Sequence, residues 1–272
     1  MNPAGALALK LVLTPVLVGA ASLAGRRWGS AIGGWLIGIP FTSGPIVLFL
    51  ALDQGSGFAA GAAAGVMTGA ISAAVFGISY AWAAQQWGWA ISLLAATVGF
   101  AAATIVLSTS EISVQGFFVV IILVIVVSLF LMPQHPWSPS GDIPMNRAGI
   151  AASETVGFPA WDLPSRMVVA TIFVVALTTI APLLGARLAG LLAPFPLYGS
   201  VLAAFAHRIQ GAGPAVGVVR GLLLGLFAFS SFFLVLALLL THGVALAFAC
   251  AIVIALAVQG ASLVIGRRLK LA

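Results

Sequence analysis

The chain has 272 residues, of which 62% are apolar and only 6% are charged, with a net charge of +6. Soluble globular domains carry about 25% charged residues, so this chain has too little polar surface to coat a water-soluble particle. The composition therefore excludes a soluble catalytic or binding domain and indicates a protein whose solvent is the lipid bilayer. The single cysteine, Cys250, lies in an apolar run, which excludes a disulfide framework.

Hydropathy predicts nine membrane spans, each close to the roughly 20 apolar residues that a transmembrane helix needs. They cover residues 4–24, 30–52, 58–83, 88–108, 112–132, 166–186, 188–206, 214–240 and 244–265. We interpret the first segment as a span rather than a signal peptide, because no charge precedes its apolar run and Lys10 interrupts it.

The basic residues divide unequally between the two sides that nine spans define. Lys10 and Arg187 fall on one side; the other side holds Arg26, Arg27, Arg147, Arg166, Arg208, Arg220, Arg267, Arg268 and Lys270. The positive-inside rule then places the N-terminus outside and the C-terminus in the cytoplasm. The basic residues form no basic face with interleaved aromatic side chains, so nucleic acid is not an expected partner.

Residues 133–165 form the one long polar stretch, which is rich in proline and predicts a cytoplasmic loop. His135, Asp142 and Glu154 lie in this loop, but their spacing matches no zinc pattern, and we expect neither a metal nor a cofactor.

An internal repeat emerges when the chain is aligned with itself at an offset of 156 residues. Residues 29–69 then align without gaps with residues 185–225, and the two copies share the string Q-G-x-G-x-A-x-G, at 54–61 and 210–217. The identical pairs begin at Gly29, Gly34, Leu36, Pro40, Phe49, Gln54, Gly55, Gly57, Ala59, Gly61, Gly65 and Gly69. The match indicates a duplication.

Each copy contains four predicted spans, and a fifth span without a counterpart separates them. An odd linking span inverts the second copy, which predicts two inverted four-helix repeats related by a two-fold axis in the membrane plane. We therefore expect an all-α integral membrane protein with a first repeat at 1–110, a linking helix at 111–132, the polar loop at 133–165 and a second repeat at 166–272.

Prolines and hydroxyls interrupt the second and seventh spans at matching depths. The interruptions read Ile39-Pro40-Phe41-Thr42-Ser43-Gly44-Pro45 and Pro194-Phe195-Pro196-Leu197-Tyr198-Gly199-Ser200. Broken helices at matching positions of two repeats are typical of transporter binding sites, although simple proline kinks remain the alternative. The predicted substrate-binding residues are Pro40, Thr42, Ser43, Gly44, Pro196, Tyr198, Gly199 and Ser200.

Glycines recur every four residues in the third and eighth spans, at Gly57, Gly61, Gly65, Gly69 and at Gly213, Gly217, Gly221, Gly225. Such ladders allow close helix packing in lipid and predict the seam between the repeats. Gln54-Gly55 and Gln210-Gly211 would be helix ends followed by glycine caps, or else a pair of gates at opposite mouths of a pathway.

Ionisable groups within spans are candidates for function. Lys10 and Arg220 can equally extend toward the membrane surface. Asp53 is either a helix cap or a coupling residue, and Glu111 or His207 could also couple transport. The predicted gating or coupling residues are Asp53, Gln54, His207, Arg208 and Gln210.

The pattern G-R-R-W-G-x-x-I-G-G-W-L-I-G-I-P-F-T-S-G-P at 25–45, with its weaker echo at 185–200, resembles small bacterial inner-membrane proteins of the GlpM-like type. Those proteins are about one repeat long, so the chain looks like a tandem fusion of two such units. The resemblance implies a four-helix unit in a bacterial inner membrane and implies no substrate.

These features favour a secondary transporter or permease for a small polar or anionic solute, bound near the midplane. The alternative is a non-transporting membrane scaffold or lipid-handling factor of the bacterial envelope. An enzyme is disfavoured because the spans hold no nucleophile with a base, no HExxH motif and no paired carboxylates. The sequence is also compatible with a homodimer in the bilayer.

The unequal distribution of basic residues between the two sides predicts the membrane topology, which can be tested. A C-terminal reporter that works only in the cytoplasm should be active, and a cysteine introduced near Asp53 should react with an impermeant reagent added outside. Outside labelling at both chain ends would make the number of spans even and remove the argument for inverted repeats.

Overall fold

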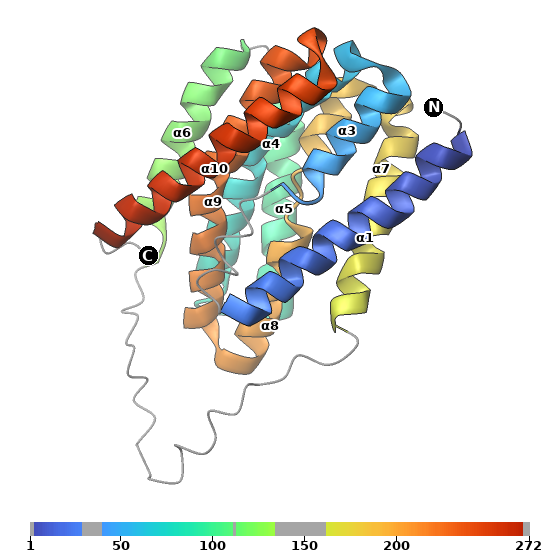
Figure 1. Cartoon of the computed structure of the whole chain (residues 1–272). Helices are drawn as coiled ribbons and strands as arrows, with labels where there is room; N and C mark the ends of the chain where they lie inside the picture. Colours follow the sequence, from blue (N-terminus) through green and yellow to red (C-terminus); the bar gives the residue numbers. More distant parts are fainter. Residues whose placement is uncertain (1–2, 29–39, 111–112, 134–161, 269–272) are drawn as a thin grey trace.

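The computed structural model describes residues 3–28, 40–110, 113–133 and 162–268, which are almost entirely helical (Figure 1). The helices are α1 (Pro3–Trp28), α3 (Ser43–Gln54), α4 (Ser56–Ala83), α5 (Trp89–Ser108), α6 (Val114–Leu131), α7 (Asp162–Leu192), α8 (Leu197–Gln210), α9 (Ala212–Leu239), a 3-10 turn (Leu240–His242) and α10 (Val244–Arg268). No strand occurs in these ranges, so the all-α prediction is confirmed for them. Glu111 and most of the predicted loop at 133–165 lie outside the described residues.

Within the described residues, six helical stretches are long and apolar enough to cross a bilayer, and the chain is a multi-pass membrane protein. They are Ser56–Ala83, Trp89–Ser108, Val114–Leu131, Leu163–Leu192, Ala212–His242 and Val244–Ala261. Helices suit this solvent because lipid offers no hydrogen bonds to the backbone. Large apolar side chains project outward from the peripheral helices, including Ile105, Phe130, Leu183 and Val253.

The helices connect alternately at the two ends of one bundle (Figure 1). Helices α3, α5 and α9 end near the N-terminus of the chain, whereas α4, α6 and α8 end at the opposite side of the bundle. Consequently α3 and α8 run in opposite directions, and so do α4 and α9.

The first predicted interruption appears as a non-helical stretch before α3, and the second as a break between two helices; residues 29–39 lie outside the described residues. Helix α3 begins only at Ser43, after a turn at residues 41–42, and residues 193–196 separate α7 from α8. Before the second break, α7 contains a sharp reversal at Gly185, whose φ of 78° and ψ of 161° lie in a region that only glycine occupies readily. This glycine falls where the sixth and seventh spans were predicted to meet.

Two further glycines close the turns that follow α3 and α8. Gly55 has φ 90° and ψ 165°, and Gly211 has φ 93° and ψ −175°. Each is the single residue between two helices, as the Gln-Gly pairs predicted. The helices that follow, Ser56–Ala83 and Ala212–Leu239, have bounds that are 156 residues apart at both ends.

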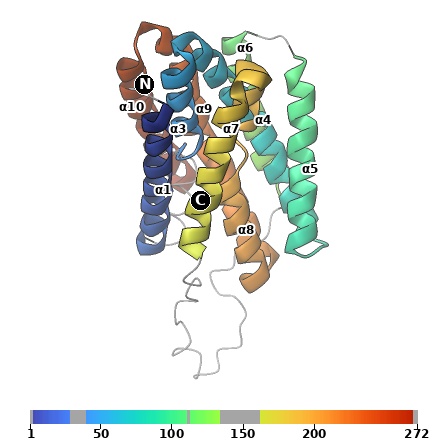
Figure 2. The same ribbon diagram turned by 90° about the vertical axis from the view of Figure 1, so that its right-hand side faces the viewer.

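Helix α4 lies in the middle of the bundle and contacts α3, α5, α6, α7 and α9 (Figure 2). Its side chains are mostly small, so its neighbours approach closely, and its larger residues Met67, Phe76 and Tyr80 are fully buried. The position of α4 therefore fixes where the surrounding helices meet.

The closest approach joins α4 to the segment of α7 after Gly185. A Cβ atom built on Gly65 would lie 2.6 Å from the Arg187 carbonyl oxygen, and one built on Gly190 would lie 2.2 Å from the Ala62 carbonyl oxygen. Only glycine fits at either position. The first glycine ladder is therefore a packing seam from Gly61 to Gly69, whereas Gly57 and Gly217 face open space.

Matched alanine substitutions test this seam. Gly57→Ala should leave the thermal unfolding midpoint in detergent unchanged or raise it, since alanine is the better helix former by up to about 1 kcal/mol. Gly65→Ala should lower the midpoint and the yield of folded protein, because its methyl group would collide with the α7 backbone. Equal midpoints for the two variants would contradict the packing.

Candidate functional site

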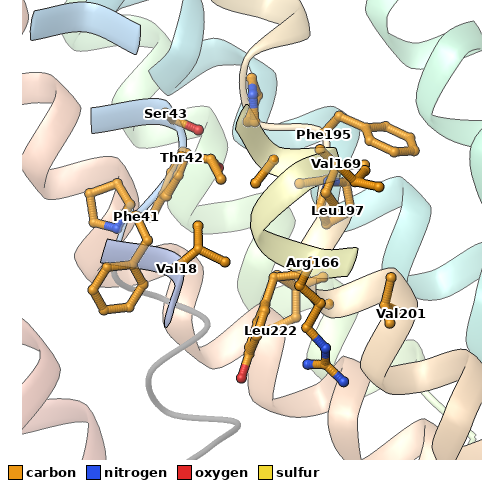
Figure 3. Close-up of a pocket in the computed structure, with 18 of the residues that line it drawn as sticks. Val18, Phe41, Thr42, Ser43, Arg166, Val169, Phe195, Leu197, Val201 and Leu222 are labelled. Atoms are coloured by element: carbon orange, nitrogen blue, oxygen red, sulfur yellow. The ribbon is translucent and has the colours of Figure 1, made fainter. Parts of the chain in front are cut away.

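The two helix breaks lie against each other in the interior of the bundle (Figure 3). The Ser43 hydroxyl, at the first residue of α3, donates a hydrogen bond of 2.8 Å to the carbonyl oxygen of Ala193, the first residue of the second break. Ser43 is buried. The bond satisfies a carbonyl that has lost its helical partner, and it ties together residues that are 150 positions apart in the chain.

A cavity of about 120 Å³ lies beside this contact. It is enclosed by α1, α3, α4, α7, α8 and α9, and its lining is mostly apolar. The lining residues are Val18, Pro40, Phe41, Thr42, Ser43, Ala73, Ser165, Arg166, Val169, Ala170, Pro194, Phe195, Pro196, Leu197, Tyr198, Gly199, Val201, Leu222, Leu226 and Phe229.

Most of the predicted substrate-binding residues surround this cavity. Pro40, Thr42, Ser43, Pro196, Tyr198 and Gly199 are all part of its lining. Two predicted residues lie elsewhere. Gly44 lines a second cavity, and the Ser200 hydroxyl donates to the Leu197 carbonyl oxygen at 2.9 Å within its own helix.

The two hydroxyls of the first break, those of Thr42 and Ser43, differ in whether they are free to bond to a ligand in the cavity. The Ser43 hydroxyl donates its proton to Ala193, as described above. The Thr42 hydroxyl makes no capping hydrogen bond to α3, although Thr42 occupies the N-cap position. Thr42 therefore offers the cavity a donor and an acceptor that the adjacent helix does not use.

Arg166 lines the cavity, although the sequence pattern did not single it out as a candidate site residue. It was counted only among the basic residues of the predicted cytoplasmic side, and the structure shows that it is buried on α7, with 7% of its surface exposed. The guanidinium carbon lies 5.2 Å from the centre of the Tyr198 ring, within the range of a cation–π contact. One signal was available in the sequence, since Arg166 follows Lys10 by the repeat offset of 156 residues.

Lys10 also turns inward rather than extending to the membrane surface. Its ammonium nitrogen lies 2.7 Å from a carboxylate oxygen of Asp53 and 5.7 Å from the centre of the Phe49 ring. Asp53 is therefore neither a cap nor a lining residue of the cavity but one half of an ion pair that joins α1 to the end of α3.

The other predicted gating residues lie away from the cavity. His207, near the end of α8, has its Nδ1 atom 3.4 Å from the buried Tyr80 hydroxyl of α4, with the two rings edge to face. Gln54, Arg208 and Gln210 are exposed at the helix ends. Arg187 donates to the Leu107 carbonyl oxygen of α5 at 3.0 Å.

A second cavity of about 250 Å³ lies between α1, α3, α9 and α10. Its lining is apolar apart from Gln259, and it shares Pro40 and Phe41 with the first cavity. No group of three metal-ligating side chains occurs within the described residues.

Comparisons with protein-family models, curated proteins and solved structures give no match to this chain.

A double-mutant cycle tests the ion pair of Lys10 and Asp53. Lys10→Met and Asp53→Asn should each lower the thermal unfolding midpoint in detergent, since each leaves one charge without its partner, and Asp53→Asn, which leaves the buried Lys10 charge, should cost more. The double variant should lose less free energy of unfolding than the two single variants lose together, and the difference, the coupling energy, should be roughly 0.5–3 kcal/mol. Arg220→Met serves as the control and should be additive with Asp53→Asn. Additivity for both pairs would contradict the ion pair.

Proposed function

We propose that this protein is a secondary transporter for a small polar or anionic solute, which binds in the cavity between the two broken helices. The observation that carries the proposal is the cavity itself, because residues from both breaks line it. Non-helical backbone is tolerated at membrane depth only where protein or a cavity satisfies it, and transporters use such breaks to hold their substrates.

Two inverted four-helix repeats are part of the proposal. The coinciding bounds of α4 and α9 at an offset of 156 residues support a duplication. The opposite directions of α3 and α8, and of α4 and α9, support inversion (Figure 1). Inverted repeats supply a physical basis for transport, because two similar halves can exchange their conformations and open the same site to either side.

Different polar contacts join the helices at the two ends of the bundle. The ion pair of Lys10 and Asp53 links α1 and α3 at the end near the N-terminus, and the contact of Tyr80 with His207 links α4 and α8 at the other. In the proposed cycle these contacts break and re-form as each end opens. We place the protein in a bacterial inner membrane, with its C-terminus in the cytoplasm.

Counterflow into proteoliposomes tests transport without knowledge of the coupling ion. Vesicles are loaded with an unlabelled solute, and entry of the same labelled solute is followed for a panel of small carboxylates, sulfonates and polyols. Labelled solute should accumulate transiently in proteoliposomes but not in protein-free vesicles. Absence of counterflow for the whole panel, with folded protein, would contradict the proposal as stated.

Thr42→Val should lower the counterflow rate of the transported solute roughly two- to tenfold, the effect of losing one neutral hydrogen bond of about 0.5–1.5 kcal/mol. The change hardly alters side-chain volume, so the protein should unfold at the same temperature. Thr97→Val provides the matched control, since Thr97 bonds only to Leu93 of its own helix and lies outside the cavity. Equal rates for both variants would leave Thr42 as a structural residue.

A lipid-handling role is the second candidate, and the second cavity favours it. This cavity is apolar and is bounded partly by α1 and α10, which also expose apolar side chains such as Val12 and Val253. An acyl chain would suit it better than a solute. Lipid that remains bound through purification, together with failure of counterflow, would favour this role.

A further inference from the structure

The contact between Tyr80 and His207 places a group that can bind a proton against a buried hydroxyl. Tyr80 is fully buried in the last turn of α4, and its hydroxyl oxygen lies 3.4 Å from the Nδ1 atom of His207. Among the described residues, His207 is the only hydrogen-bond partner of this hydroxyl. A phenol keeps its proton at neutral pH, so the contact is satisfied when the Tyr80 hydroxyl donates to Nδ1 of a neutral imidazole.

Protonation of His207 removes the acceptor from this contact. Both ring nitrogens of an imidazolium are donors, so the Tyr80 oxygen can then only accept, and its own proton is left without a partner. An unsatisfied buried donor is destabilising, and so is a charge held against buried apolar side chains. Protonated His207 is therefore more stable when α8 has moved away from Tyr80 and water surrounds the imidazolium.

The helices around His207 carry no carboxylate that would compensate its positive charge. Helices α5 and α9 pack against α8. Helix α5 has no titratable side chain, α9 has Arg220 alone, and α4 has Tyr80 alone. Helix α8 itself adds Tyr198 in its first turn and the exposed cation Arg208 beside His207. The carbonyl groups at the end of α8 stabilise a nearby cation, and they stay with His207 when the helix moves.

A continuous row of aromatic rings joins His207 to the first cavity. The imidazole lies edge to face with the Tyr80 ring at 6.1 Å between ring centres, and Tyr80 stacks with Phe76, one turn earlier on α4, at 6.4 Å. Phe76 in turn contacts Phe195 edge to face at 6.0 Å. Phe195 belongs to the second break and lines the cavity. Packed side chains therefore connect His207 to the cavity wall without a gap.

Helix α8 gives a second connection between the same two places. Its first turn, with Leu197, Tyr198 and Gly199, lines the cavity, and its last turn carries His207. Its 14 residues span about 21 Å at 1.5 Å per residue, so the two ends move together when the helix moves as a rigid body. Movement of the last turn away from α4 thus changes the wall of the cavity.

We propose that His207 is a proton-binding site that opens this end of the bundle. A proton from the aqueous phase binds at Nδ1, the last turn of α8 separates from α4, and loss of the proton restores the contact with Tyr80. This inference rests on the proposed function for its biological meaning, in which the proton controls access to the cavity from this end. The opening itself can be measured without transport.

The distance between two spin labels tests the opening in the full-length protein. The labels are attached to Gln86→Cys, just after α4, and Ile209→Cys, in the last turn of α8, because both positions are exposed. Cys250→Ser removes the native cysteine, and the protein is placed in lipid nanodiscs. The mean distance should increase by several ångströms between pH 8 and pH 5, with a midpoint in the range where histidine titrates.

Further variants of this labelled protein assign the change to the contact. His207→Gln does not titrate and should give the same distance at both pH values. Tyr80→Phe removes the hydroxyl whose proton loses its acceptor, and should reduce the pH-dependent increase by at least half. His242→Gln is the matched control, since His242 is exposed at the opposite end of the bundle, and His135→Gln is a second control. Both controls should respond to pH as the labelled protein does.

The outcomes separate the proton site from the transport proposal. A distance that is independent of pH in the labelled protein would overturn the inference, even if His207→Gln failed to fold. An unchanged pH response in folded His207→Gln or Tyr80→Phe would overturn it as well. Opening at low pH without counterflow would support the proton site and contradict the transporter, whereas counterflow with a distance independent of pH would support the transporter and overturn the proton site.

Discussion

Every backbone N–H and C=O group inside a bilayer needs a partner within the protein, and this requirement determines how two interrupted helices can exist in this fold. A break exposed to lipid would leave several of these groups unsatisfied. The breaks before α3 and α8 instead face each other, and the Ser43 hydroxyl supplies a partner to the Ala193 carbonyl oxygen. Each interruption therefore depends on the other, and the cavity beside them is a consequence of placing two proline-containing turns together in the interior.

The depth of that meeting point is set by how closely α7 can approach α4. The chain reverses at Gly185, and the segment that follows lies against α4 at Gly65 and Gly190, where no side chain fits between the backbones. This contact fixes the short returning segment, so the carbonyl oxygen of Ala193 lies within reach of Ser43. Larger residues at the seam would push the second break away from the first and leave both breaks without partners.

The sequence predicts features that depend on local chemistry and misses those that depend on side-chain direction. Prolines and glycines inside apolar segments indicated the positions of both breaks, and the Gln-Gly pairs indicated the turns at Gly55 and Gly211. Hydropathy gives the depth of Lys10 and Arg166 but cannot say that both side chains point inward, since that direction follows from helix rotation and tertiary neighbours. The direction of Gly44, which was predicted to line the substrate site, could not be read from the sequence for a similar reason. It follows Ser43 by one residue, a rotation of about 100° around the helix, and so faces the other cavity.

Under the proposed inverted arrangement, corresponding residues of the two repeats lie at opposite ends of the molecule, so a difference between them makes the two ends unequal. Lys10 is neutralised by Asp53 beside the turn into α4, and this ion pair joins α1 to the end of α3. Arg166 reaches Tyr198 instead, and the space around it forms part of the cavity. The second repeat has Ile209 at the position that matches Asp53, so different contacts hold the two ends of the bundle.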